Sequence, residues 1–247
     1  MRKLTSGLLS ILLLSSVSSS GGWFGSGDKR PQPPFLHVEG TRITDANGNG
    51  VVLRGPNIGS WFLIEPWMLR LDGQHQIESE KDIWDVMEKR FGREAKLDLI
   101  RTHRGNFFTE EDVRRIAALG LNCIRVPVWW RAVSDPEYGG DFAWLDQCVQ
   151  WCRSHGLYII IDLHGAPGGQ SNEGRILGER STGALWKEAK YRQQTIEWWR
   201  EVAERYRDEP AVAGYDLLNE AYTVGNMSTL AGFYDELYKA IRAVDTH

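Results

Sequence analysis

Four polar residues stand on or at the C-terminal ends of separate apolar runs, and their types suit acid–base chemistry. They are Arg125, His164 and the adjacent pair Asn219 and Glu220. A carboxylic acid can protonate a leaving oxygen and then, as the carboxylate, activate water, provided that neighbouring groups tune its pKa. Glu220 at a strand end can equally cap the next helix, and Arg125 and His164 can be satisfied core residues. The elements that carry them decide between these interpretations.

The apolar runs predict strands buried on both faces. Three are nearly continuous, at Cys123–Val128, Tyr158–Leu163 and Val212–Leu218, and Val51–Leu53 is a short fourth. Before two of them a helical pattern ends at glycine, at Gly120 and Gly156, and the strand starts within two residues. Repeated helix–strand joints of this kind predict a parallel sheet in an α/β fold.

Three helices are predicted between the strands. Thr109 and Asp112 form a capping-box pattern at the start of the first. Apolar residues from Trp144 to Cys152 give the second its stripe, and Pro210 stops the third, which covers 187–206. Cys148 and Cys152 lie four residues apart in the second helix, where packing explains them better than a disulfide.

Two parallel architectures fit, a doubly wound open sheet and a (β/α)₈ TIM barrel. No Gly-x-Gly-x-x-Gly follows the first strand, which disfavours the dinucleotide-binding open sheet. A barrel collects catalytic groups at the C-terminal ends of its strands, so Arg125, His164 and Glu220 would converge there. We therefore expect the barrel, and no nucleotide cofactor.

Alternation along the strands refines this expectation. Asp162 and His164 share one face of their strand, and Asp216 shares the parity of Glu220, so we expect Asp216 to pair with Arg125. Asn219 and Glu220 cannot both face inward on a regular strand. The strand must therefore end or bulge at that point.

Before the first helix the sequence predicts a β-hairpin whose turn is Asp45–Gly50, where Asn47-Gly48 supplies the positive φ angles. The same hexapeptide fits the opening of a calcium loop, but position twelve is Pro56 where a bidentate Glu is needed. The six histidines form no His-Glu-x-x-His pattern, and Asp162-x-His164 alone is a weak metal signal. We expect no metal and no cofactor.

Composition bounds the class of protein. Hydrophobic residues make up 42% and aromatic residues 11%, enough for one sizeable core, and the net charge of −4 disfavours nucleic-acid binding and a polybasic membrane patch. Residues 1–20 have the layout of a secretory signal peptide, 21–34 read as a flexible linker, and 35–247 as the domain. We expect a secreted or periplasmic protein that does not stay in a membrane after signal cleavage.

Five motifs in order and spacing resemble glycoside hydrolase family 5, the cellulase family: Leu53-Arg54-Gly55-Pro56-Asn57-Ile58-Gly59-Ser60-Trp61, Thr109-Glu110-Glu111-Asp112, Ile124-Arg125-Val126-Pro127, Asp162-Leu163-His164-Gly165-Ala166-Pro167-Gly168 and Leu217-Leu218-Asn219-Glu220. The resemblance runs from about Phe35 to the end. Glu65-Pro66-Trp67 and the His-Gly-Ala-Pro-Gly loop look most like the exo-β-1,3-glucanase branch.

The resemblance implies a retaining hydrolase of β-1,3- or β-1,4-linked glucan, with an oligo- or polysaccharide as its partner. Glu220 would be the general acid/base and Asn219 would hold the sugar 2-hydroxyl. Arg125 and His164 would orient and tune the carboxylates. Glu65 and Trp61 would contact the non-reducing-end sugar. Trp67, Trp129 and Trp130 also follow predicted strands, where their rings would either stack on sugars or fill the core.

The chain departs from the family pattern at two points. Ala221 stands where Pro usually follows the catalytic Glu, and the nucleophilic Glu of the family belongs to late strands that do not occur before His247. We therefore expect the N-terminal portion of a barrel, about four βα units. Two rival functions remain: a non-catalytic carbohydrate-binding protein of the same fold, and a metal-dependent hydrolase on a similar barrel.

Overall fold

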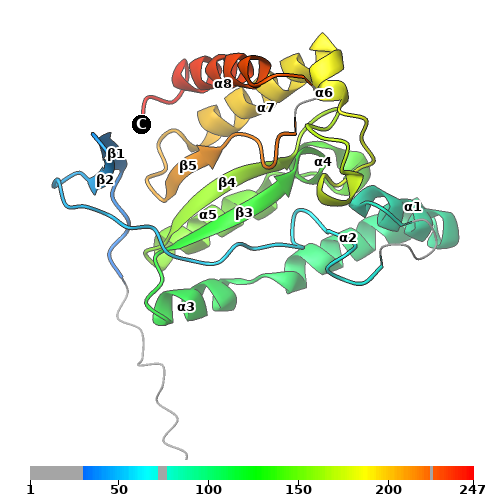
Figure 1. Ribbon diagram of the computed structural model, residues 1–247. Helices are drawn as coiled ribbons and strands as arrows, with labels where there is room; N and C mark the ends of the chain where they lie inside the picture. Colours follow the sequence, from blue (N-terminus) through cyan, green and yellow to red (C-terminus); the bar gives the residue numbers. More distant parts are fainter. Residues whose placement is uncertain (1–29, 72–76, 223–224) are drawn as a thin grey trace, which may run out of the picture.

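The computed structural model describes residues 30–71, 77–222 and 225–247 (Figure 1). The predicted signal peptide lies outside these residues, as does the first part of the predicted linker. The rest of that linker contacts the domain, because Arg30 Nη1 donates to the carbonyl of Leu121 over 2.8 Å. The carbonyl of Pro34 accepts a hydrogen bond from Tyr158 Oη over 3.0 Å. Ordered structure thus begins before Phe35.

The expected hairpin is present, but its turn comes earlier in the chain. Strands β1 (Leu36–Glu39) and β2 (Arg42–Asp45) pair antiparallel around Gly40, whose φ is 63°. The predicted turn at Asp45–Gly50 also forms, since Oδ1 of Asp45 accepts from two backbone amides of that loop. After this turn only one pair of residues, Thr44 and Gly50, forms a β-bridge.

The predicted strand at Val51–Leu53 is wrong. These residues adopt no strand, because the chain leaves the hairpin here to reach β3. The carbonyl of Arg54 accepts from the amide of Cys123 over 3.1 Å. Gly55 makes this approach possible, since a Cβ there would lie 1.4 Å from the carbonyl oxygen of Cys123. Parallel pairing follows instead at Asn57 and Phe62, which form isolated bridges to β3.

The other three predicted strands form one parallel sheet in the order β3-β4-β5. They are β3 (Cys123–Trp129), β4 (Tyr158–Gly165) and β5 (Val212–Asp216). Strands β3 and β4 are almost wholly buried, whereas every residue of β5 is half-buried. The difference arises because, among the described residues, β5 pairs only with β4. Strand β5 also ends two residues before the predicted Leu218.

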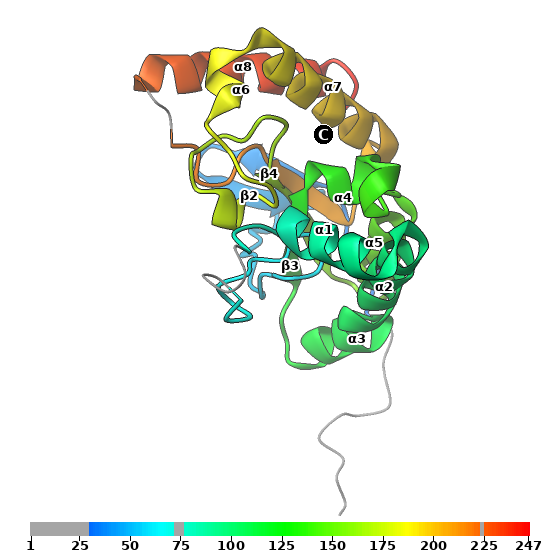
Figure 2. The ribbon, with the colours of Figure 1, turned by 90° about the vertical axis from the view of Figure 1, so that its right-hand side faces the viewer.

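Helices arch around the sheet (Figure 2). The three predicted helices correspond to α3 (Glu110–Ala118), α5 (Ala143–Ser154) and α7 (Ala189–Tyr206), and the capping box of Thr109 and Asp112 forms at the start of α3. Five further helices complete the described part: α1 (Glu80–Phe91), α2 (Arg93–Phe107), α4 (Trp130–Ser134), α6 (Ala184–Lys187) and α8 (Met227–Arg242).

The core lies between the sheet and these helices. Cys148 and Cys152 are buried free thiols in α5, as packing predicts. Within the described ranges no helix has the length and apolar character that a membrane crossing requires.

Candidate active site

Four polar side chains close a ring at the C-terminal ends of the parallel strands. Arg125 Nη2 donates to Asn219 Oδ1 (2.9 Å), and Asn219 Nδ2 lies 3.1 Å from His164 Nε2. His164 Nδ1 lies 2.5 Å from Asp162 Oδ2, which is 3.0 Å from Arg125 Nη2. Three of the predicted catalytic residues are therefore linked through Asn219, although Arg125 lies in β3, His164 in β4 and Asn219 three residues after β5.

The ring fixes the protonation pattern of His164. An arginine offers only donors, so the Asn219 atom that faces Arg125 is its oxygen and the atom that faces His164 is its NH₂ group. Nε2 of His164 must then accept, and its proton must sit on Nδ1, where it is donated to Asp162. The carboxylate of Asp162 thus sets the tautomer through which His164 holds Asn219.

Asp162 is wholly buried, and burial raises its pKa against the lowering influence of its hydrogen bond to His164. One of its oxygens, Oδ1, has no hydrogen-bond partner among the described residues. The other oxygen, Oδ2, contacts both His164 Nδ1 and Arg125 Nη2. Asp162 therefore depends on Arg125 and His164 for its place in the core.

Arg125 makes the ion pair that alternation predicts. Its Nε and Nη2 lie 3.0 and 2.8 Å from Asp216 Oδ2, and Nη1 donates to Asn57 Oδ1 over 2.8 Å. The guanidinium of Arg125 thereby links Asp216 of β5 to Asn57, which forms an isolated bridge to β3. The side chain of Arg125 keeps 27% of its surface exposed.

Glu220 follows the ring directly and is exposed. Its φ of 44° confirms the expected break in the strand, since β5 has already ended at Asp216. Tyr222 Oη donates to Glu220 Oε2 over 3.2 Å. The charge of Glu220 raises the pKa of Tyr222, so the phenol stays a hydrogen-bond donor to this carboxylate.

The two predicted substrate contacts lie in different surroundings. Glu65 is half-buried and accepts a hydrogen bond from Trp67 Nε1 over 3.1 Å, and the Trp67 ring is 47% exposed. Trp61 has no exposed surface, donates Nε1 to the carbonyl of Arg104 over 2.9 Å and packs against Phe108. A wholly buried ring has no face to offer a sugar, so Trp61 serves the core and Trp67 is the exposed aromatic beside Glu65. Trp129 is also wholly buried.

Sequence reasoning missed two residues of this site. Tyr222 sits two positions after Glu220, and Gln170 bonds the backbone of both His164 and Asn219. The glutamine lies in the Gly-rich stretch 165–183, whose composition predicts a mobile loop. Yet Gln170 and Ser171 there are wholly buried. A buried amide in a loop has no signature in composition, which explains the omission.

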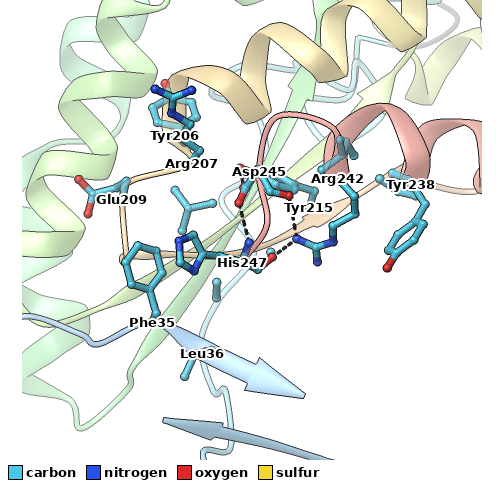
Figure 3. Close-up of a pocket in the computed structure, with 15 residues that line it drawn as sticks. Phe35, Leu36, Tyr206, Arg207, Glu209, Tyr215, Tyr238, Arg242, Asp245 and His247 are labelled. Carbon is cyan, nitrogen blue, oxygen red and sulfur yellow. Dashed lines mark hydrogen bonds between the residues drawn. The ribbon is translucent and has the colours of Figure 1, made fainter. Parts of the chain in front are cut away.

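Two of the hollows in the described structure involve the loop after β4 and strand β5. One, of about 540 Å³, is lined by polar side chains that include Glu173, Arg175 and Arg180 of the loop after β4. Glu173 is close enough to Tyr222 to contribute to its raised pKa. The other, of about 170 Å³, lies along β5 between Phe35, Tyr215 and the end of α8 (Figure 3). None of the ring residues lines either of these two hollows. Arg125 instead lines a third hollow, of about 190 Å³, together with Asn57 and Ile160. No group of three or more His, Cys, Asp or Glu residues in the described ranges is arranged to hold a metal ion.

Comparison with known proteins shows which family the chain belongs to. The model of the family described as cellulase (glycosyl hydrolase family 5) matches residues 87–247. The chain belongs to this family. The match includes the ring residues, Glu220 and Tyr222. The resemblance noted in the five motifs is therefore confirmed for the family.

Curated relatives agree with this assignment. The chain is 35% identical to a β-xylosidase of Phanerodontia chrysosporium over 86% of this chain and 44% of that protein. It is 32% identical to a probable glucan 1,3-β-glucosidase A of Neosartorya fischeri, over 83% and 50%. A glucan 1,3-β-glucosidase of Candida oleophila is also 32% identical, over 78% and 48%. The chain spans about half the length of the curated relatives it matches.

Solved structures show the fold. A rutinosidase from Aspergillus niger superimposes with a TM-score of 0.64 at 17% identity, over 77% of this chain and 59% of that one. A β-glucanase from Saccharophagus degradans superimposes with a TM-score of 0.54 at 21% identity, over 88% and 53%. With these neighbours and the family match, the parallel sheet and its surrounding helices form part of a (β/α)₈ barrel.

Proposed function

We propose that this chain is the part of a retaining β-glucan hydrolase that contributes the general acid/base, Glu220. The observation that carries the proposal is an exposed carboxylate four residues after the end of β5, directly after a ring that orients its neighbour Asn219. The relatives named glucan 1,3-β-glucosidases support a β-linked glucan, β-1,3 or β-1,4, as the substrate. The signal-like residues 1–20 support action in a secreted or periplasmic location.

In this proposal Glu220 first protonates the glycosidic oxygen as the leaving group departs. The resulting carboxylate then takes a proton from the water that attacks the glycosyl–enzyme intermediate. Tyr222, which donates to Glu220 Oε2 in the structure, would stabilise the carboxylate form. Asn219, whose Oδ1 is held by Arg125 and whose Nδ2 is held by His164, would bind the sugar 2-hydroxyl. Glu65 and the exposed Trp67 would bind the non-reducing-end sugar.

Double displacement also needs a nucleophilic carboxylate about 5–5.5 Å from the acid/base. We propose that it comes from sequence beyond residue 247. The relatives are about twice as long as the span they share with this chain, which supports that proposal. Sequencing the source DNA downstream of the His247 codon tests it: an in-frame late-strand Glu is expected, and a stop codon there excludes this mechanism.

The decisive test is Glu220→Gln in the protein expressed from its complete coding sequence. We expect glucan hydrolysis to fall by at least about 10²-fold, the usual contribution of a general acid. The melting temperature should not change, since Glu220 is exposed. Glu201→Gln is the matched control, because Glu201 is an exposed carboxylate on α7 for which the described part of the chain shows no side-chain hydrogen bond or ion pair. Normal activity of the Glu220→Gln protein would refute the proposal.

The anomer formed first, followed by proton NMR, tests the retaining mechanism. An initial β-product is expected, and an initial α-product would mean inversion. If the wild-type protein binds glucan oligosaccharides without cleaving them, the non-catalytic binding function is the correct one. Loss of activity in a chelator would favour the metal-dependent rival.

A second substrate class follows from the β-xylosidase relative, whose identity of 35% is above that of the glucosidases. Glucose and xylose differ only in the hydroxymethyl group at C5. Comparing kcat/KM for aryl β-glucoside and aryl β-xyloside decides between them. We expect the glucoside to be preferred.

A further inference from the structure

The side chain of Gln170 is wholly buried beneath the ends of β4 and β5. Its Nε2 donates to two carbonyl oxygens, that of His164 at 2.7 Å and that of Asn219 at 2.8 Å. Its Oε1 accepts from the amide of Ala166 over 3.1 Å. Both amide protons and the oxygen are thus engaged with backbone groups. The carbonyls that it holds belong to two residues of the ring.

The bond to Asn219 bears on Glu220 directly. The carbonyl of Asn219 and the amide of Glu220 belong to one planar peptide group. The direction of the Glu220 side chain is set by rotation from that plane, through the φ of 44°. This left-handed conformation costs a residue other than glycine about 1–3 kcal/mol unless its surroundings hold it. On the far side, the carbonyl of Glu220 accepts from the amide of Tyr222 over 2.8 Å.

Gln170 is itself held firmly. Its carbonyl accepts from Trp186 Nε1 over 2.8 Å, which fastens the loop to α6. Just before it, Gly168 and Gly169 have φ of 74° and 71° and turn the chain back beneath the strand ends. The space around Gly169 allows no side chain, since a Cβ there would lie 2.0 Å from Ser181 Oγ. These contacts fix the backbone of Gln170, and thereby the position of its side-chain amide relative to the two carbonyl groups.

We propose that Gln170 is a positioning residue that fixes the Asn219–Glu220 peptide group and thereby aims the Glu220 carboxyl at the glycosidic oxygen. The inference rests on the proposed function of Glu220. It adds a residue that touches neither substrate nor reacting atoms. Only a donor of Gln size performs this task here: a carboxylate would face two carbonyl oxygens, and a leucine would leave both without a partner.

Comparing two substrates with different leaving groups distinguishes a misplaced Glu220 carboxyl from general damage to the fold. An alkyl β-glucoside needs protonation of its leaving oxygen, whereas a dinitrophenyl β-glucoside leaves without it. The parameter kcat/KM reports the steps up to departure of the leaving group. A misaimed acid therefore lowers kcat/KM for the alkyl glucoside alone, and partial unfolding lowers both values equally.

The experiment uses Gln170→Leu in the protein expressed from its complete coding sequence. We expect kcat/KM to fall about 10- to 100-fold for the alkyl glucoside, the effect of a displacement of about 1 Å. The value for the dinitrophenyl glucoside should be nearly unchanged. Gln193→Leu is the matched control, because Gln193 is exposed on α7 and bonds only Glu197 in the described structure. It should leave both values at the wild-type level.

Equal losses for the two substrates, or no loss for either, would overturn the proposal. If Gln170→Leu does not fold, Gln170→Glu is measured in its place, since it keeps the size of the side chain and an acceptor for Ala166 but loses the donors. Glu220→Gln is run in parallel and should show the same selective loss more strongly. If that variant hydrolyses the alkyl glucoside normally, the proposed function fails irrespective of Gln170.

Discussion

Arg125 Nη2 and Asn219 Oδ1 lie 2.9 Å apart although 94 positions separate the two residues in the chain. This bond orients the Asn219 amide, and the orientation determines which nitrogen of His164 carries the proton. Because each member contacts the next, we expect the ring to act as a unit. The sequence predicts Arg125, His164 and Asn219 as separate polar residues on or at strand ends, and the structure joins them through contacts that include Asp162.

A ring of this kind predicts coupled stability effects. Arg125→Met and Asn219→Ala should each lower the free energy of unfolding, and the double variant should lose less than the sum by about 0.5–3 kcal/mol. Urea unfolding of all four proteins measures the coupling energy. Arg125→Met combined with Arg101→Ala is the control, since Arg101 is exposed on α2 and pairs with Asp98. That pair should add within about 0.5 kcal/mol; an equal result for both pairs would show that the ring is not a unit.

Two tryptophans that the motifs place near the substrate should behave in opposite ways. Trp61→Ala removes a wholly buried ring and should lower the free energy of unfolding by about 3–5 kcal/mol. Trp67→Ala removes a ring that is 47% exposed and should change stability by only about 0.5 kcal/mol. It should nevertheless weaken binding of a glucan oligosaccharide, measured by calorimetry. Unchanged binding after Trp67→Ala would remove Trp67 from the proposed sugar site.

Strand positions were predictable because a strand buried on both faces reads as a continuous apolar run. Cys123–Val128 and Tyr158–Leu163 lie within β3 and β4. Val51–Leu53 is also apolar, but Val52 is 65% exposed, and the chain pairs with β3 only from Asn57. Three apolar residues carry too little pattern to separate a strand from a connecting segment.

Site residues were predictable where strand alternation places them, and not where a loop does. The contact of Arg125 with Asp216 follows from parity, because the two strands share one interior. Gln170 reaches the same place through two glycines with positive φ, and no periodicity marks that path. The burial of Trp61 depends on Phe108 and Arg104, which lie far along the chain.

Lowering the pH should remove the stability that the ion pairs of Glu111 contribute to helix α3. Glu111 accepts from Arg114 at 2.6 Å and from Arg115 at 2.9 Å, and these hydrogen bonds lower the pKa of Glu111 from 4.5 to about 2. A folded-state pKa below the unfolded one adds stability that is present above about pH 4.5 and is lost as the pH falls toward 2. Wild type should thus be more stable than Glu111→Gln above pH 4.5, and the difference should vanish near pH 2.

Urea unfolding of both proteins at a series of pH values measures this difference. Glu201→Gln on α7 is the control, since the Glu201 side chain makes no hydrogen bond or ion pair in the described part of the chain. A gap between wild type and Glu111→Gln that stays constant down to pH 2 would contradict the role of these hydrogen bonds.

Strand β5 predicts how the chain behaves when expressed alone. In the described structure it pairs only with β4, its residues are half-buried, and the hollow of about 170 Å³ lies alongside it (Figure 3). An unpaired strand presents free amides and carbonyls to other chains. We expect residues 30–247 to associate in a concentration-dependent manner in sedimentation velocity. The product of the complete coding sequence should not associate if its further residues cover β5. A monodisperse, cooperatively melting monomer of residues 30–247 would show that the edge of β5 needs no cover.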